Sequence, residues 1–212
     1  MGGFFNPEKG IWAWLSTMVD VCGLSIVWIF LCLPVVTIGP ATAALYYTVV
    51  KCVRGRESGA FGYYFRSFLG GFKTGLLATL AVLPAALLLW MGHDVVRWYG
   101  TNLGGAAYIL YVAYYFALIV PGGVLCWLFP LLGRFEYSLK DLFRTAFQLS
   151  IVHLPSTVVV VLLTAQTAVF CLERWWPVLF MPSVAMLLVS LFTERIFAKY
   201  SPELAPEEDT EE

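Results

Sequence analysis

The sequence predicts an all-α fold, a polytopic bundle of membrane helices, because several features point the same way. Hydrophobic residues make up 60% of the chain and charged residues only 13%, whereas soluble domains carry about 25% charged residues. Five stretches contain no Asp, Glu, Lys or Arg, and each is close to or above the ~20 residues that span a bilayer. These stretches are Val21–Val50, Thr74–Gly92, Trp98–Gly133, Thr145–Leu172 and Trp175–Thr193. We therefore expect residues 1–200 to form one transmembrane domain in contact with the lipid bilayer.

The basic residues predict the topology. Most of the 13 Lys and Arg residues follow the first, third and fifth stretches, and such loops stay in the cytoplasm. They are Lys51, Arg54, Arg56, Arg66, Lys73, Arg134, Lys140, Arg144, Arg195 and Lys199. Five spans then place the N-terminus outside the cell membrane and the C-terminus in the cytoplasm. A six-span alternative requires the first stretch, or Ile11–Met18, to cross separately.

The first stretch contains a predicted break. Pro34 lacks a backbone N–H and its ring clashes with the preceding turn, so the first span should kink or end there. Gly39 permits unusual backbone angles. Pro40 can open a new helix at its first position, with Thr37 as a cap. A second, shorter helix is expected over Ala41–Val53.

Two of the basic segments carry the apolar spacing of amphipathic helices. In the first the apolar residues are Phe61, Tyr64, Phe65, Phe68, Leu69 and Phe72; in the second they are Leu139, Leu142, Phe143, Ala146 and Phe147. Four cations lie off these stripes, namely Arg66, Lys73, Lys140 and Arg144. Both helices are expected on the cytoplasmic face, where these cations would contact a partner or the anionic inner leaflet.

The two stripes superimpose when one is shifted by about 78 residues, which suggests an internal duplication. Upstream, Pro40 precedes Arg54 as Pro121 precedes Arg134, with a difference of one residue. A parallel repeat over residues 20–92 and 106–172, with 175–193 as an extra helix, would follow. The alternative is that loops on the inner side attract amphipathic helices independently.

A second Gly/Pro break falls in the third stretch, at Pro121, Gly122 and Gly123. Freed backbone groups at membrane depth must be shielded by protein or must line a water-filled cavity. This break and the one at Thr37, Gly39 and Pro40 therefore mark either a solute or hinge site, or simple packing kinks.

The chain carries no recognisable catalytic pattern. Its two histidines, His93 and His153, lie far apart, and its five cysteines form no Cys-x-x-Cys pair, so neither a metal site nor a cofactor site is expected. No phosphate-binding loop is present, and the basic residues are explained by topology rather than by nucleic acid. We expect no enzyme. Tyr108, Tyr111 and Tyr115 share one helix face, which suits core packing or sugar stacking. The acidic tail, residues 201–212, is expected to be disordered in the cytoplasm.

One long motif resembles a known family. The run Leu33-Pro34-Val35-Val36-Thr37-Ile38-Gly39-Pro40-Ala41, followed by Phe65-Arg66-Ser67-Phe68, is similar to the YesL family of bacterial integral membrane proteins. That resemblance implies an accessory role beside ABC-type importers of oligosaccharides, with the importer permease or its ATPase as partner. Residues Leu139–Ser150 lack the acidic start and the glycine of the loop by which such permeases dock their ATPase. A small-solute transporter or channel in its own right is the alternative, and a homo-oligomer stays open.

Overall fold

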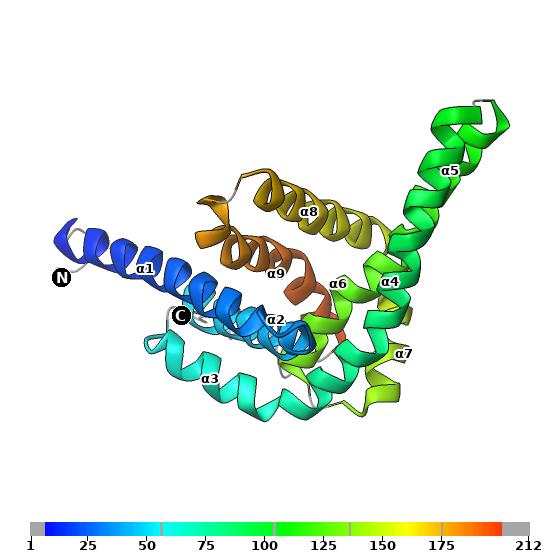
Figure 1. Cartoon of the computed structure of the whole chain (residues 1–212). Helices are drawn as coiled ribbons and strands as arrows, with labels where there is room; N and C mark the ends of the chain where they lie inside the picture. The colour runs from blue at the N-terminus through cyan, green and yellow to red at the C-terminus, as the bar shows by residue number, and fades with distance from the viewer. Residues whose placement is uncertain (1–6, 56, 104, 136, 175, 201–212) are drawn as a thin grey trace.

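The computed structural model describes residues 7–55, 57–103, 105–135, 137–174 and 176–200, and all regular structure in these ranges is helical (Figure 1). Five helical segments are long and apolar enough to cross a membrane: Val35–Arg54, Phe72–Asn102, Tyr108–Arg134, Leu154–Glu173 and Met181–Lys199. The prediction of an all-α polytopic bundle is confirmed. The predicted disordered tail at 201–212, and Trp175 at the start of the fifth predicted span, lie outside the described residues.

The predicted break near Pro34 is confirmed as a helix end followed by a second, shorter helix, rather than as a kink. Helix α1 (Pro7–Cys32) ends just before Pro34, and after a 3₁₀ turn, η1 (Val35–Thr37), the chain reverses into α2 (Ile38–Thr48) and the π-helical η2 (Val49–Arg54). The indole of Trp28 donates to the Thr42 hydroxyl at 3.2 Å across the pair. The proline ends α1 as its missing N–H requires, but the result is an antiparallel hairpin.

The residues of this turn act differently from the prediction. Thr37 is the residue before α2, but its hydroxyl does not cap that helix; it donates to the carbonyls of Leu31 and Pro34, the latter at 2.6 Å. It thereby satisfies acceptors left free at the end of α1. Pro40 is the third residue of α2 rather than the first. That position lies within the first turn, where the missing N–H disrupts no helical bond.

Helix α3 (Ala60–Gly70) runs back along α2, and α4 (Phe72–Leu103) follows it. At 32 residues α4 is about 48 Å long, more than the hydrocarbon core of a bilayer. Its far half pairs with α5 (Ala106–Ala117), and this pair projects from the other helices (Figure 1). Gly100 makes the close approach possible, because a Cβ there would lie 2.7 Å from the Cβ of Tyr111.

The tyrosine face on α5 is not a core. Tyr108 and Tyr115 are exposed, and the Tyr115 hydroxyl lies 2.7 Å from Nε2 of His93 on α4. Of the two interpretations of this face, core packing is therefore wrong. Large apolar side chains beside it are exposed as well, as lipid contact requires of a membrane helix.

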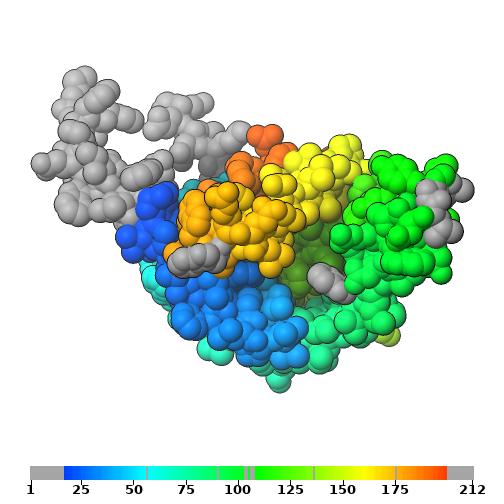
Figure 2. Space-filling view, turned by 45° about the horizontal axis from the view of Figure 1, so that its top comes forward, coloured from blue at the N-terminus to red at the C-terminus, as the bar shows by residue number. Residues whose placement is uncertain are grey.

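The second half of the chain begins with α6 (Ile119–Arg134), which follows α5 after a single turn residue, Leu118. Helix α7 (Leu139–Val152) packs along α6, and α8 (Leu154–Glu173) follows. A 3₁₀ turn, η3 (Trp176–Leu179), leads to α9 (Met181–Tyr200). Both η3 and the start of α9 lie against α1, as the neighbouring blue and orange surfaces of Figure 2 show, and the hydroxyls of Ser25 on α1 and Ser183 on α9 are 2.8 Å apart.

Two hydrophobic clusters form the core, one built mainly on α2 with α1 and α3, the other on α6 with α7 and α9. Helices α2 and α6 join them. A Cβ on Gly133 would lie 2.6 Å from the carbonyl oxygen of Ala43, so only glycine allows this backbone approach. Trp127 and Tyr46 are the largest fully buried side chains of the cluster on α6. The centre of the molecule is thus the α2–α6 contact.

Both predicted amphipathic helices are present, but each buries only part of its stripe. In α3 the buried residues are Ala60, Tyr64 and Phe68, whereas Phe61, Phe65 and Leu69 are exposed. In α7 the buried residues are Leu142, Ala146, Leu149 and Ser150, and Phe147 is half exposed. The wide apolar face has one edge against the protein and a second edge that is free for lipid or another chain.

The two halves show the same packing scheme. Helix α3 packs on α2 as α7 packs on α6, and α4 packs on α2 as α8 packs on α6. The hydroxyl of Thr79 donates to a carbonyl one turn earlier in α4 and receives the N–H of Gly39 at 3.0 Å. The hydroxyl of Thr157, 78 residues later, likewise donates to a carbonyl one turn earlier, that of His153, and accepts the indole N–H of Trp127. The duplication stays a hypothesis, to which this parallel adds support.

Candidate functional site

A buried ion pair lies where α2, α6 and α9 meet. Nη2 of Arg134, the last residue of α6, is 2.6 Å from Oε2 of Glu194 on α9. The two side chains are only 17% and 11% exposed. The phenol of Tyr46 donates to the other carboxylate oxygen at 2.8 Å and lies 2.7 Å from the Thr193 hydroxyl. Buried charges are tolerated when they are paired and hydrogen-bonded in this way.

A second arginine lies beside this pair. Nη1 of Arg54, at the end of η2, donates to the carbonyl of Ser190 at 3.1 Å. Nε of Arg134 is buried and has no hydrogen-bond partner within the described part of the chain. Two guanidinium groups and one carboxylate leave the cluster with an excess positive charge, which favours an anionic or strongly polar neighbour.

Two cavities adjoin the ion pair. The first, about 470 Å³, lies between the α3–α4 junction and the end of α6, and is lined by Ser67, Gly70, Gly71, Thr74, Leu132, Gly133, Arg134, Phe135 and Tyr137. The second, about 380 Å³, is lined by Val50, Arg54, Gly55, Arg134, Glu194, Arg195 and Ala198. Arg134 lines both cavities and Glu194 only the second, so the Arg134 side chain stands between them. Small residues create the first cavity, because Gly70 and Gly71 place no side chain in it.

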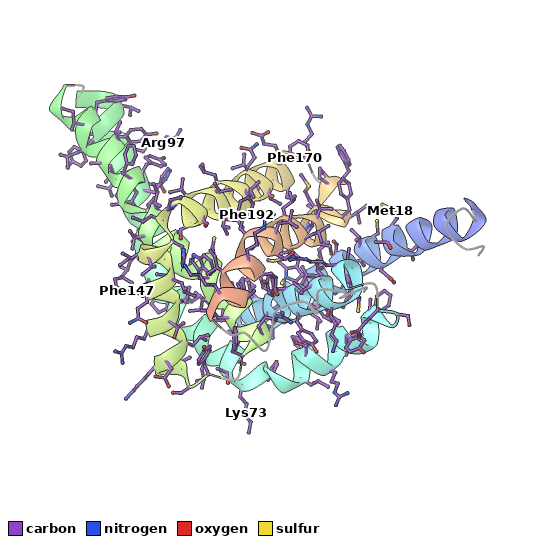
Figure 3. The ribbon with its side chains drawn as sticks, turned by 180° about the vertical axis from the view of Figure 1, so that it is seen from behind. Met18, Lys73, Arg97, Phe147, Phe170 and Phe192 are labelled. Carbon is purple, nitrogen blue, oxygen red and sulfur yellow. The ribbon has the colours of Figure 1, made fainter. Side chains whose placement is uncertain are left out.

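The four predicted contact cations are all exposed: Arg66 on α3, Lys73 at the start of α4, and Lys140 and Arg144 on α7. Within the described residues none of the four makes a hydrogen bond or an ion pair. Lys73 points away from the helices (Figure 3). Arg66 also lines a third cavity, which it shares with Lys51. These cations are therefore free to meet an external partner.

The two Gly/Pro breaks pack separately, each within its own half of the chain. A Cβ on Gly39 would collide with the Thr79 hydroxyl and would lie 2.6 Å from the Gly75 carbonyl oxygen, both on α4. A Cβ on Gly123 would lie 2.6 Å from the Ser150 hydroxyl of α7 and would collide with the Thr157 methyl of α8. Pro121, like Pro40, is the third residue of its helix, and Gly122 faces Val161 with ordinary spacing. Close helix packing thus accounts for Gly39 and Gly123, one glycine at each break.

Sequence reasoning missed the ion pair. Arg134 and Arg54 were interpreted as loop charges, and Glu194 and Tyr46 were not singled out. One signal was present, because Glu194 is the first acid after the fifth apolar stretch and Arg134 the first base after the third. Both stretches were expected to end on the same side of the membrane, so opposite charges at their ends could have been paired. Among the described residues, no group of three or more His, Cys, Asp or Glu could hold a metal ion.

Comparison with known families gives one match. Residues 21–92, about a third of the chain, match the family described as "Protein of unknown function, DUF624". The comparisons with curated proteins and with solved structures found no match. The matched region runs from the second half of α1 into α4, and it contains Tyr46, Arg54 and Arg66. Over this region the chain is similar to a family of unknown function, and the narrower YesL resemblance stays a prediction.

Proposed function

We propose that this membrane protein is a non-catalytic accessory component of an ABC-type oligosaccharide importer, and that it docks on the importer permease or its ATPase. The observation that carries the docking is the set of exposed cations Arg66, Lys73, Lys140 and Arg144, which have no pairing partner among the residues that the structure describes. The carbohydrate association is implied by the YesL resemblance alone.

The surface around these cations supports contact with another protein. Exposed apolar side chains accompany them, Phe65 and Leu69 on α3 and Phe147 and Ile151 on α7. A mixed surface of aromatic and basic groups is typical of protein interfaces. A partner with acidic side chains would pair with the cations, and a partner helix would cover the aromatic edge.

Orientation is part of the proposal. The positive-inside rule supports placing Arg54, Arg134, Arg195 and the C-terminus in the cytoplasm of a cell-membrane protein. The sequence-based prediction put the N-terminus outside. Helix α1 is not among the five long apolar segments, but its antiparallel pairing with Val35–Arg54 supports the six-span alternative, in which α1 crosses as well and the N-terminus lies on the same side as Arg54.

The test is crosslinking in native membranes, followed by purification in mild detergent and mass spectrometry of the proteins recovered. We expect permease and solute-binding subunits of a sugar importer to co-purify with the wild-type chain. The charge reversals Arg66→Glu and Arg144→Glu should abolish this recovery. Arg97→Glu, an exposed cation on the projecting part of α4, is the matched control and should not. Unchanged recovery with the double reversal contradicts the docking surface.

A second candidate function is transport by the chain itself, and the two cavities that meet at Arg134 favour it. A charged side chain between two cavities, held by a carboxylate in one of them, can separate two compartments of a solute path. Purified protein in vesicles should then move a small anionic or polar solute without an ATPase, and Glu194→Gln should change the rate. Recovery of homo-oligomers alone in the crosslinking experiment would favour this function, and no flux across a broad solute panel would contradict it.

A further inference from the structure

A third cavity, of about 450 Å³, opens between η2 and α3 and has two cations in its wall. It is lined by Tyr47, Lys51, Tyr63, Arg66 and Ser67. Lys51 comes from the last turn of η2 and Arg66 from the middle of α3. The ion pair at Arg134 and the docking cations on α7 lie outside this cavity, whereas Arg66 belongs both to its wall and to the proposed docking surface.

Lys51 is held in place by its neighbours. Its ammonium lies 5.0 Å from the ring centre of Tyr63 and 5.8 Å from that of Tyr47, so both rings face the cation. The Tyr47 hydroxyl is 3.5 Å away, and Glu57 is at 4.0 Å, the outer limit of an ion pair. The pKa of Tyr63 is raised, chiefly by a hydrogen bond to Glu57. Glu57 is therefore shared between a phenol and an ammonium.

Arg66 has no such partner. Within the described residues its guanidinium makes no hydrogen bond and no ion pair, although it faces the same cavity as Lys51. Two cations and the single carboxylate of Glu57 leave an excess of one positive charge. A planar guanidinium beside a positioned ammonium and a serine hydroxyl is a donor set suited to a phosphate group.

The remaining surface of α3 indicates where that phosphate comes from. At 100° per residue, the buried stripe of Ala60, Tyr64 and Phe68 separates two edges. One edge carries the exposed apolar residues Phe61, Phe65 and Leu69; the other carries Tyr63, Ser67 and Gly70. A helix with an apolar edge and a polar edge on either side of its buried face lies at a boundary between lipid and water.

Arg66 and Gly62 lie on the outward face, between these two edges. A Cβ on Gly62 would meet nothing within 4 Å, so the backbone there is open to close approach. A lipid molecule beside α3 can therefore place its chains along the aromatic edge and its headgroup at Arg66. Free phosphate would use the cations but would gain nothing from Phe61, Phe65 and Leu69.

We propose that this cavity, which we call the Lys51–Arg66 cavity, binds the phosphate of an anionic phospholipid, with the acyl chains along Phe61, Phe65 and Leu69. Such a lipid would supply the negative charge that balances the two cations, and its acyl chains would cover the exposed apolar edge of α3. The inference does not rest on the importer partnership, because it needs only this chain and a bilayer.

The test is native mass spectrometry of the purified full chain after exposure to an equimolar mixture of phosphatidylglycerol and phosphatidylcholine. Wild type should retain phosphatidylglycerol in preference to phosphatidylcholine. Each cation near a membrane surface contributes roughly a five-fold change in affinity, so Arg66→Gln should lower retained phosphatidylglycerol about five-fold. Arg66 is exposed, so this variant should fold as wild type does, which circular dichroism checks.

Lys73→Gln is the matched control, because Lys73 is exposed on the next helix and is not part of the cavity wall. It should leave the retained lipid nearly unchanged. An equal loss in Arg66→Gln and Lys73→Gln would indicate general surface attraction and overturn the site. Equal retention of phosphatidylcholine by wild type would also overturn it. Displacement of the lipid by millimolar inorganic phosphate would assign the cavity to free phosphate instead.

Discussion

Replacing Glu194 by Gln removes the carboxylate that Arg134 meets at 2.6 Å and leaves the largely buried guanidinium without a counter-charge. The other charged groups that line the adjoining cavity are cations, Arg54 and Arg195. Removing one partner of a buried ion pair costs about 3–5 kcal/mol. The amide oxygen can still accept the Tyr46 hydroxyl, so we expect the lower end, about 3 kcal/mol.

The loss of stability is measurable by thermal unfolding in detergent, monitored through tryptophan fluorescence. Trp127 is fully buried and packs edge-on against Phe197 at 5.9 Å, so its emission reports on the helix contacts around the ion pair. For a chain of this size, 1 kcal/mol shifts Tm by about 2–4 °C, so Glu194→Gln should lower Tm by about 6–12 °C. Glu173→Gln, an exposed carboxylate at the end of α8, is the control and should change Tm little.

The double variant Arg134→Met/Glu194→Met removes both charges, so it separates the cost of leaving one charge without its partner from the loss of the pair itself. Apolar groups of similar volume can replace a buried ion pair at little cost, so the double variant should be more stable than Glu194→Gln alone. A Tm for Glu194→Gln within about 2 °C of wild type would refute the view that Arg134 depends on this carboxylate. A double variant less stable than Glu194→Gln would refute the same view.

Three further predictions follow from the packing. Gly39→Ala should lower the free energy of unfolding by about 1–3 kcal/mol, because its methyl group would collide with Thr79. Gly122→Ala is the control, since a methyl group there would have ordinary spacing to Val161. Equal effects of the two substitutions in thermal unfolding would contradict the packing. Tyr64→Phe should cost about 1 kcal/mol by removing the buried bond to Ala41 at 3.2 Å, measured in the same assay. Reporter domains placed at the N-terminus and in the loop 55–59 should map to the same side of the membrane, and opposite sides would contradict the α1–α2 hairpin.

Much of the architecture follows from hydropathy, since each of the four apolar stretches from Thr74 onward contains most of one apolar segment long enough to cross a membrane. Within Val21–Val50 the helix end and the second helix were predicted, but the reversal of direction between them was not, and this has a physical cause. Pro34 predicts that α1 ends, but whether the next helix continues forward or folds back depends on tertiary contacts, such as the bond from Trp28 to Thr42. Apolar periodicity carries no information about that direction.

The candidate site was harder to predict than the fold, because its residues come from three distant helices. Tyr46 is apolar in hydropathy terms, and Arg134 looks like any cation at the inner end of a span. Only the α2–α6 approach at Gly133 and the position of α9 bring them to Glu194. The exposed cations were easier to predict, since helical spacing alone places Arg66 and Arg144 off the apolar stripes.

Helix α9 gives the two similar halves unequal roles. Arg54 and Arg134 hold corresponding places at the ends of their helices, yet only Arg134 meets a carboxylate, whereas Arg54 meets a backbone carbonyl of α9. Tyr46 binds the same carboxylate from the first half. Thus α9, the element outside the hypothetical repeat, bonds to both halves within the five residues from Ser190 to Glu194. Any movement of α2 relative to α6 must stretch or break one of these contacts, so the stability of the Glu194 cluster sets how readily the two halves can move.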